Sequence, residues 1–293
     1  MGLTLKTIAI PAILVALATT VTLSVVLTRS PEVDPEPRSY IKPEPIHITV
    51  SESDHYPNGL GKSPILGFST KQHFRCQTDC EIFPDNCLND INLLQVANSM
   101  ASNGYINRKY VNYEYIIIDD CWSAENRTDD GNLVGDPNRF PDMPGFIKSL
   151  HNLGFKVGLT LDVTDQTCNG FPGSSGYEQQ DVDLLNKWGV DYVNLDSCSL
   201  EFELEDIEKQ VEKVSDLLLA SSRDIFVHCV YPSYFEDTAH NTEIDYEFTK
   251  KHCNSWQNWI DSQDSFETVT DQINWFGKNQ DYGFVIAKNI SLS

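Results

Sequence analysis

Tyr115-Ile116-Ile117-Ile118-Asp119-Asp120-Cys121-Trp122 is the stretch of this chain that says most about its fold. Three β-branched apolar residues in a row predict a strand that is fully buried. Two adjacent carboxylates follow at the carboxyl end of that strand. In folds that alternate helices with parallel strands, the carboxyl ends of the strands carry the functional site. For one strand taken alone, an aspartate pair is equally consistent with a solvated loop.

The same design, an apolar run that ends in an aspartate, occurs three more times along the chain. The runs are Lys156–Asp162, Tyr192–Asp196 and Trp256–Asp261. A carboxylate that recurs at successive strand ends is hard to explain as solvation. We therefore expect these aspartates to share one site at the carboxyl ends of parallel strands.

Strand-like and helix-like segments alternate from Asn58 onward. Further apolar runs lie near Ile65–Phe68 and Ile225–Cys229. Segments with helical spacing separate the runs, at Asp90–Ser102, Phe146–Leu153, Gln180–Trp188 and Leu204–Ala220. The strand starts recur roughly every 30 to 50 residues, as expected for βα units with long loops. The chain has 293 residues, and a single α/β barrel of eight such units uses about 250.

The charge of the chain limits its partners. The formal net charge is −22 at pH 7. A surface so short of Lys and Arg disfavours nucleic acids and anionic membrane surfaces. Solubility is the commonest meaning of such a charge, and it indicates nothing more specific.

The N-terminal segment predicts a membrane anchor. Residues Thr7 to Leu27 form an apolar run, and its length is enough to cross a bilayer as a helix. A cleaved signal peptide is the main alternative, because Ala16-Leu17-Ala18 is similar to a cleavage site. The residues from Val21 to Leu27 remain apolar beyond that site, which favours an uncleaved signal anchor over residues 1–29.

Two further regions follow the anchor. Residues 30–57 are rich in Pro, Glu and Asp and predict an extended linker. Residues 58–293 are predicted to form the folded domain. We expect a single-pass membrane protein whose C-terminal domain is lumenal or extracellular. If the signal is cleaved, the domain is instead secreted or lysosomal.

The cysteines agree with entry into the secretory pathway. All eight lie beyond the apolar segment, at Cys76, Cys80, Cys87, Cys121, Cys168, Cys198, Cys229 and Cys253. An even number in an oxidising compartment indicates disulfides. A zinc cluster is the rival interpretation, but the chain has no C-x-x-C pair, and its histidines show no metal spacing. We expect no metal and no cofactor. Asn126 and Asn289 begin N-glycosylation sequons.

Eight motifs in order resemble one known family. They are Asn58-Gly59-Leu60-Gly61-Lys62-Ser63-Pro64, Leu66-Gly67, Cys76-x3-Cys80-x6-Cys87, Ile118-Asp119-Asp120-Cys121-Trp122, Asp136-Pro137-x-Arg139-Phe140-Pro141, Cys168-x-Gly170-Phe171-Pro172-Gly173-Ser174, Trp188-Gly189-Val190-Asp191 and Cys253-Asn254-x-Trp256. Together they resemble glycoside hydrolase family 27, the lysosomal-type α-galactosidases and α-N-acetylgalactosaminidases, over residues 58–264. The resemblance implies a TIM-type (β/α)8 barrel, usually followed by a small β-sandwich.

The resemblance also implies roles for individual residues. Asp196 matches the catalytic nucleophile and Asp261 the general acid/base of a retaining glycosidase, whose two carboxyl groups stand about 5 Å apart. Asp119 and Asp120 match the pair that binds sugar hydroxyls, and the expected substrate-binding positions are Asp119, Asp120, Trp122, Asn194 and Gln257. The implied disulfides are Cys76–Cys121, Cys80–Cys87, Cys168–Cys198 and Cys229–Cys253.

Several positions of the sugar pocket depart from the family pattern. Asn194 stands where the family has Lys, and Gln257 where it has Arg. Val230 and Ser233 occupy the positions that recognise the C2 substituent, which in the galactosidases are Glu and Leu. Phe68 replaces a Trp and Thr160 a Tyr. Loss of the two cations is expected to raise the pKa values of the facing carboxylates.

The end of the chain departs from the family as well. The residues after Trp275 could supply at most one more strand. We therefore expect a barrel that lacks its last βα unit and the C-terminal β-sandwich. An open barrel leaves strand edges unpaired and favours association, as a homo- or hetero-oligomer.

These departures divide the function three ways. We favour a weakly active or non-catalytic relative, a pseudoenzyme that acts as a structural or glycan-binding subunit. The first alternative is an active retaining exo-α-galactosidase or α-N-acetylgalactosaminidase, which the presence of Asp196 and Asp261 supports. The second is an enzyme with changed sugar specificity, suggested by Val230 and Ser233. The expected ligand in each case is a carbohydrate.

Overall fold

The computed structural model describes residues 56–63, 65–106, 112–198, 203–236, 244–257, 259 and 265–278. The predicted anchor, most of the predicted linker, Asp261 and Asn289 lie outside these residues. Within the described ranges, no helix combines the length and the apolar character needed to cross a membrane.

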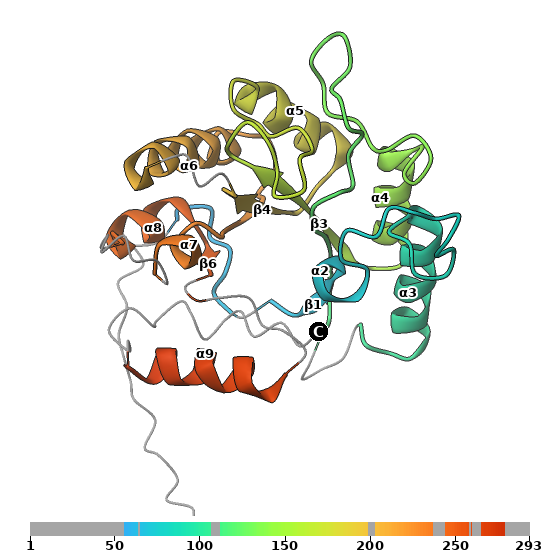
Figure 1. The fold of residues 1–293 in the computed structure, drawn as a ribbon, viewed down its shortest axis with the longest axis horizontal. Coiled ribbons are helices and arrows are strands. Elements are labelled where there is room, and N and C mark those ends of the chain that lie inside the picture. The colour runs from blue at the N-terminus through green and yellow to red at the C-terminus, as the bar shows by residue number, and fades with distance from the viewer. Residues whose placement is uncertain are drawn as a thin grey trace, which may run out of the picture. The chain divides into compact units, whose positions relative to one another are not determined.

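Six parallel strands form one sheet in the order β1-β2-β3-β4-β5-β6. The strands are β1 (Gly67–Ser69), β2 (Tyr115–Ile118), β3 (Lys156–Asp162), β4 (Tyr192–Asp196), β5 (Phe226–Cys229) and β6 (Ser255–Trp256). The sheet curls, so that its strands lie around a common interior (Figure 1). Sequential order with parallel pairing is the arrangement of a βα barrel. The expected fold class is therefore confirmed in its coarse form, as a curled parallel sheet of the barrel type.

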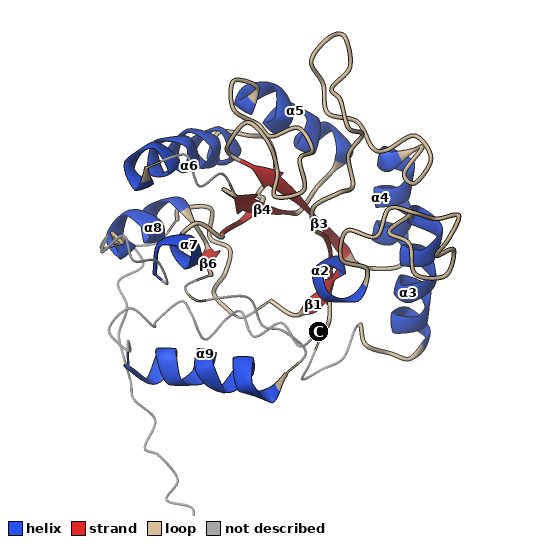
Figure 2. Cartoon of the chain, in the orientation of Figure 1, coloured by secondary structure: helices blue, strands red, loops and turns tan. Residues whose placement is uncertain are grey.

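The described helices are α2 (Thr70–His73), α3 (Asp90–Ser102), α4 (Met143–Asn152), α5 (Glu178–Trp188), α6 (Leu204–Leu219), α7 (Pro232–Glu236), α8 (Tyr246–His252) and α9 (Phe266–Lys278). Of these, α3, α4, α5 and α6 lie outside the sheet, whereas the short α2 lies over the end of β1 (Figure 2). The four helices predicted from spacing all exist. The α3 prediction has the observed bounds, and the other three differ by one to three residues at an end, where capping rather than periodicity sets the boundary.

Alternation along the strands separates two apolar clusters. Ile116, Leu159, Val193 and Val227 point outward and belong to the large core beneath the helices. A smaller cluster fills the interior of the curl, with Tyr115, Tyr192 and Phe226 buried against Leu60, Ile65 and Ile117. Because side chains alternate with a period of two, every second residue of each strand faces this interior.

Gly158 makes room for the interior cluster. A Cβ atom at this position would lie 2.6 Å from Cδ1 of Tyr192 and 3.2 Å from Cγ1 of Ile117. The ring of Tyr192 stacks on Phe226 with a centroid distance of 5.3 Å. The absence of a side chain at Gly158 is therefore what allows a tyrosine on the neighbouring strand to lie inside the curl.

Four disulfides link segments of the domain: two join loops that follow different strands, one closes a single loop, and one joins the end of β5 to the end of α8. The pairs are Cys76–Cys121, Cys80–Cys87, Cys168–Cys198 and Cys229–Cys253. This pairing, implied by the resemblance, is confirmed. Four disulfides in one domain are typical of proteins that fold in the secretory pathway.

Candidate functional site

Strand register brings polar residues from successive strands into one layer. Thr160 pairs with Asn194, Asn194 with His228, and His228 with Ser255. Asp119 follows β2 directly and joins the same layer, because its Oδ1 accepts a hydrogen bond of 2.9 Å from the Thr160 hydroxyl. The interior is thus apolar toward the amino ends of the strands and polar toward their carboxyl ends.

Further contacts connect this polar layer. Asn194 Nδ2 donates to Thr160 Oγ1 at 3.3 Å. His228 Nδ1 lies 2.8 Å from the hydroxyl oxygen of Ser255. All of these side chains are buried. Thr160, named above only as a departure from the family pattern, therefore links two of the predicted substrate-binding residues, Asp119 and Asn194.

Asp196, the predicted nucleophile, ends β4 one layer further toward the strand ends. Its register partner on β3 is Asp162, and its side chain is 5% exposed. Oδ1 of Asp196 accepts hydrogen bonds from the hydroxyl of Tyr234 at 2.7 Å and from the backbone NH of Ser197 at 2.8 Å. The carboxylate is therefore held by its own chain.

The environment of Asp196 favours its neutral form. Burial raises the pKa of Asp196 to about 7, and the charges of Asp162 and Asp119 act in the same direction. The hydrogen bond from Tyr234 and the positive charge of Lys71, on α2, lower the pKa but do not offset the burial. Removal of a carboxylate from water without a matching cation destabilises its charged form.

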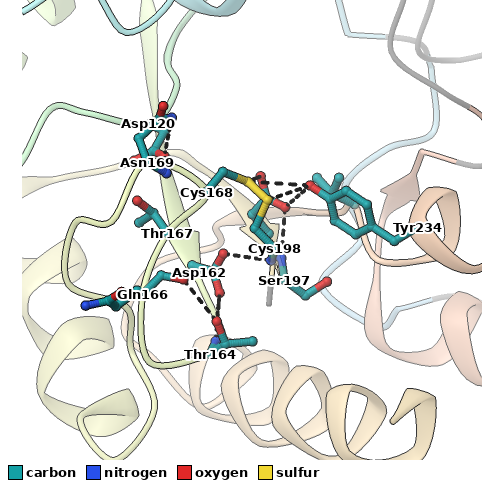
Figure 3. Close-up of a disulfide and its surroundings, with 12 residues drawn as sticks. Asp120, Asp162, Thr164, Gln166, Thr167, Cys168, Asn169, Ser197, Cys198 and Tyr234 are labelled. Atoms are coloured by element: carbon teal, nitrogen blue, oxygen red, sulfur yellow. Dashed lines mark hydrogen bonds between the residues drawn. A yellow bond between two sulfur atoms is a disulfide. The ribbon is translucent and has the colours of Figure 1, made fainter. Parts of the chain in front are cut away.

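Tyr234 was not among the predicted site residues. It lies on α7, just after β5, and its hydroxyl oxygen is 3.7 Å from Cys168 Sγ and 3.6 Å from Cys198 Sγ (Figure 3). The Tyr234 hydroxyl thus lies beside both the Cys168–Cys198 disulfide and the Asp196 carboxylate. No periodicity or strand-end position marked Tyr234 in the sequence, because a short helix turns its side chain back toward the site.

Asp119 and Asp120 are also engaged by the chain. Besides Thr160, Oδ1 of Asp119 accepts the backbone NH of Asp120 at 2.9 Å. Asp120 Oδ2 accepts both the backbone NH and the side-chain amide of Asn169, at 3.1 and 2.8 Å (Figure 3). The backbone NH of Asp119 donates to Thr70 Oγ1 at 2.8 Å. These bonds tie the end of β2 to α2 and to the loop after β3.

Cys121, directly after this pair, adopts a left-handed backbone conformation with a φ of 70°. Few residues other than glycine adopt this region. Arg139 Nη1 donates to the carbonyl oxygen of Cys121 at 2.6 Å and to that of Leu88 at 3.2 Å. The motif that contains Arg139 therefore supports the turn after β2.

Asp162, which ends β3, belongs to the same group of carboxylates. Its Oδ1 accepts the NH and the hydroxyl of Thr164, at 2.8 and 2.6 Å, and its Oδ2 accepts the NH of Cys198 at 3.0 Å. Burial raises the pKa of Asp162, although these hydrogen bonds lower it. Asp162 therefore links the loop after β3 to the loop after β4.

The other predicted substrate-binding residues have distinct surroundings. The indole NH of Trp122 donates to the backbone carbonyl of Thr160 at 2.9 Å, and its ring packs edge-on against Trp188. Trp122 is 3% exposed, so it lies in the packing around the polar layer. The side-chain amide of Gln257 donates to the Trp259 carbonyl at 3.0 Å. Asp261, the predicted acid/base, lies outside the described residues.

The positions expected to recognise the C2 substituent follow β5. Val230 and Ser233 are both buried, at 2% and 6% exposed. The hydroxyl of Ser233 donates to the Val230 carbonyl at 2.9 Å. A buried apolar side chain, that of Val230, therefore stands where the family pattern has a carboxylate.

One group near Asp196 has the residue types of a metal site. Possible ligand atoms of Cys168, Asp196 and Cys198 lie within 4.8 Å of one another. The two cysteines form a disulfide, so neither can supply the thiolate that binds metals. These three residues therefore do not form a metal centre in the oxidised protein.

Known proteins share this fold and much of this sequence. The family described as Alpha galactosidase A matches residues 63–289. Alpha-galactosidase A of Homo sapiens is 34% identical over 227 residues, which cover 76% of this chain and 51% of that protein. Alpha-N-acetylgalactosaminidase of Homo sapiens is 34% identical over 227 residues, covering 76% of this chain and 53% of that protein. The chain thus spans about half the length of the curated relatives it matches.

A solved structure extends the similarity to three dimensions. The α-galactosidase from Saccharomyces cerevisiae, determined with raffinose, is similar with a TM-score of 0.57 and 29% identity. The similar region covers 71% of this chain and 41% of that chain.

Proposed function

Because the chain belongs to the alpha galactosidase A family, we propose that its folded domain binds a terminal α-galactoside or related glycan and hydrolyses it very weakly. The sugar would lie at the carboxyl ends of the strands, above the polar layer of the curl. Asp196 would occupy the nucleophile position and Asp261 the acid/base position. Asp119, Asp120, Trp122, Asn194 and Gln257 would form or support the sugar contacts.

The proposal of weak hydrolysis rests on the protonation state of Asp196. A retaining glycosidase needs an ionised nucleophile together with a protonated acid. Burial raises the pKa of Asp196 to about 7, so at mildly acidic pH most of this carboxyl group is protonated. A protonated carboxyl group is a poor nucleophile, which lowers the rate of the first chemical step.

Neutral neighbours of Asp196 support the same conclusion. Asn194 is buried two residues before Asp196 on β4 and bonds to Thr160. Gln257 follows β6. The family pattern has Lys and Arg at these two positions, so two charges that would stabilise an ionised Asp196 are replaced by amides. A lost hydrogen bond to a charged group typically costs about 1.5–3 kcal/mol.

Sugar binding remains compatible with the observed hydrogen bonds. An ionised carboxylate offers about four lone-pair sites. Asp119 and Asp120 can therefore keep their bonds to the chain and still accept hydroxyl groups of a ligand. Binding then needs no rearrangement of the loops that Asn169 and Thr70 hold.

The full chain should be assayed with aryl α-galactosides and α-N-acetylgalactosaminides from pH 4 to 9, beside calorimetric titration with galactose. We expect measurable binding that Asp119→Asn weakens, and turnover lower by orders of magnitude than that of an active α-galactosidase run in parallel. Robust turnover that Asp196→Asn abolishes would contradict weak hydrolysis. Absence of binding to every sugar tested would contradict the glycan-binding role.

A second candidate is an active retaining glycosidase with a shifted pH range. It is favoured by the two donors on Asp196 Oδ1, from Tyr234 and Ser197, because both stabilise the ionised form. For this candidate the rate rises as the pH passes 7. The assay above separates the two candidates by the height and the position of the pH profile.

We further propose that residues 1–29 anchor the domain to a membrane and that the sheet associates with a second chain. The length of the apolar segment from Thr7 to Leu27 supports the anchor. In the described sheet, β1 and β6 are the two edge strands, and edge strands favour association. Asn126 is exposed, as a glycosylated asparagine must be. Protease protection in microsomes tests the anchor, and analytical ultracentrifugation tests the association.

A further inference from the structure

A short disulfide-closed loop carries large apolar side chains into solvent. The Cys80–Cys87 bridge closes the loop, and within it Ile82 and Phe83 are 68% and 47% exposed. Ile91, on the first turn of α3, is 63% exposed. We name Ile82, Phe83 and Ile91 the apolar tip.

Hydrogen bonds hold the loop of the apolar tip in one conformation. Oδ1 of Asp79 accepts the NH groups of Glu81 and Ile82, at 3.1 and 2.9 Å. The side-chain amide of Asn92, on α3, donates to the carbonyls of Pro84 and Cys87, at 2.8 and 2.9 Å. The loop therefore lies against the start of α3, and Figure 1 shows the chain between α2 and α3 passing beside that helix.

This rigidity bears on binding. Ile82 and Phe83 lie in a loop that is already ordered by a disulfide and by Asp79, so a partner would not have to order it. Preorganisation of this kind lowers the entropic cost of association. Aromatic side chains such as that of Phe83 are enriched in the buried cores of protein interfaces.

The charged side chains of the loop and of the first turn of α3 are all acidic. Asp79, just before the loop, and Glu81 and Asp85 within it are exposed, and Asp90 precedes Ile91. The sequence contains no Lys or Arg between Arg75 and Arg108. A complementary surface therefore combines apolar side chains with flanking positive charge.

We propose that the apolar tip is a docking surface for a protein segment that carries aromatic or aliphatic side chains flanked by Lys or Arg. The acidic side chains disfavour anionic lipid as the occupant. A second copy docked tip to tip is disfavoured as well, because Glu81 and Asp85 of the two copies would face one another. The proposal is independent of any sugar bound by the domain.

The position of the apolar tip sets where such a partner would lie. The loop follows β1 and α2, and Cys76, just before it, is bridged to Cys121 after β2. The tip therefore belongs to the loops at the carboxyl end of the sheet, the end that carries Asp119 and Asp196. A partner docked on the tip would lie at the same end of the domain as the candidate site.

Selection of phage-displayed random peptides on the purified full chain tests the proposal. We expect enriched peptides to contain an aromatic or aliphatic residue flanked by Lys or Arg. Their affinity, measured by fluorescence anisotropy with the synthetic peptides, should fall at least tenfold for Ile82→Ser/Phe83→Ser. It should fall severalfold for Glu81→Gln/Asp85→Asn and at higher salt. Leu219→Ser, which removes an apolar side chain exposed to 40% on α6, is the matched control and should change nothing.

Three outcomes would overturn the proposal. Enriched peptides whose affinity is the same for the tip variants and for the parent would place their site elsewhere. Binding to phosphatidylcholine vesicles that Phe83→Ser abolishes would make the tip a lipid contact. Self-association in ultracentrifugation that Ile82→Ser/Phe83→Ser abolishes would make it a contact between copies. Circular dichroism melting of each variant confirms folding, and the Glu81→Gln/Asp85→Asn pair tests the charge complementarity without touching an apolar side chain.

Discussion

At the scale of single residues, the hydrogen bonds and charges around one carboxyl group, that of Asp196, decide its pKa. Asp196 receives two hydrogen bonds on Oδ1, from Tyr234 and from Ser197. Burial nevertheless raises the pKa of Asp196 to about 7, and among the described residues Lys71 is the cation that opposes this. A buried carboxyl group with few positive charges nearby keeps its proton to a higher pH, because its neutral form is less costly to bury than its charged form.

Replacing Tyr234 by phenylalanine should raise the pKa of Asp196 further. A hydrogen bond to a charged group is worth about 1.5–3 kcal/mol, and about 1.4 kcal/mol corresponds to one pH unit. We expect the titration midpoint to move up by about one unit or more, as followed by carbon-13 NMR of labelled aspartate side chains. Tyr231→Phe is the control, because the Tyr231 hydroxyl bonds to Thr249. An unchanged or lowered midpoint in Tyr234→Phe would show that this hydrogen bond does not act on the carboxylate.

At the scale of elements, the packing inside the curl depends on the glycine that β3 carries beside a tyrosine of β4. Gly158 on β3 faces Tyr192 on β4, and the Tyr192 ring stacks on Phe226 of β5. Above this cluster the same strands place Thr160, Asn194 and His228 in register. The polar layer therefore lies on a layer of packed apolar side chains that three neighbouring strands contribute.

Gly158→Ala should destabilise the domain. The added methyl group would lie 2.6 Å from the Tyr192 ring, and overpacking of a core typically costs about 1–3 kcal/mol. We expect urea denaturation to show a loss in this range, and Tyr192→Leu in the same chain to recover part of it. Gly277→Ala is the matched control, because nothing lies within 4 Å of that position on α9. A Gly158→Ala variant as stable as the parent would mean that Tyr192 relaxes without cost.

At the scale of the whole molecule, excess negative charge and buried carboxyl groups couple stability to pH. Burial raises the pKa of Glu208, on α6, to about 7, and the charges of Asp245 and Glu205 add to this effect. Asp196 has a raised pKa of the same size. His252 acts in the opposite direction, because burial lowers its pKa.

Stability should fall as the pH rises from 5 to 8. The folded pKa values of Asp196 and Glu208, about 7, lie above the ordinary values of 3.8 and 4.5. The folded state therefore holds these protons more tightly, and this stabilisation is present in full below about pH 4 and lost as the pH passes 7. Each group contributes a slope of at most about 1.4 kcal/mol per pH unit, less for Glu208, which is partly exposed.

Urea denaturation at pH 5, 6, 7 and 8 measures this slope in the free energy of unfolding. Asp196→Asn should flatten it, since the amide does not titrate, whereas Asp183→Asn on the outside of α5 should leave it unchanged. A free energy of unfolding that increases steadily from pH 5 to 8 would contradict the assignment of raised pKa values to these carboxyl groups.

Much of this architecture follows from the sequence alone. Apolar runs that end in Asp identified β2, β3 and β4 with bounds within one residue of those observed, because buried parallel strands are continuous hydrophobic runs. The helices α3 to α6 were predicted from apolar residues that recur with the period of an α-helix. Eight motifs in order indicated the family and the disulfide pairs, which spacing alone leaves open. At β6 the prediction of Trp256–Asp261 is tested only in part, because Trp256 belongs to the observed Ser255–Trp256 while Asn258, Ile260 and Asp261 lie outside the described residues.

Only the tertiary structure decided what surrounds the aspartates. Tyr234, 38 residues after Asp196 in the chain, reaches its carboxylate from a helix of five residues, and Asn169 reaches Asp120 across 49 residues. No local pattern marks such partners, because hydrogen bonds between loops depend on where the strands place the loop ends. The pKa of Asp196 likewise depends on burial and on charges from other strands. The sequence therefore indicated the strand-end aspartates as candidates for the site, and the packing of the curl, which buries Asp196, is what raises the pKa of that residue.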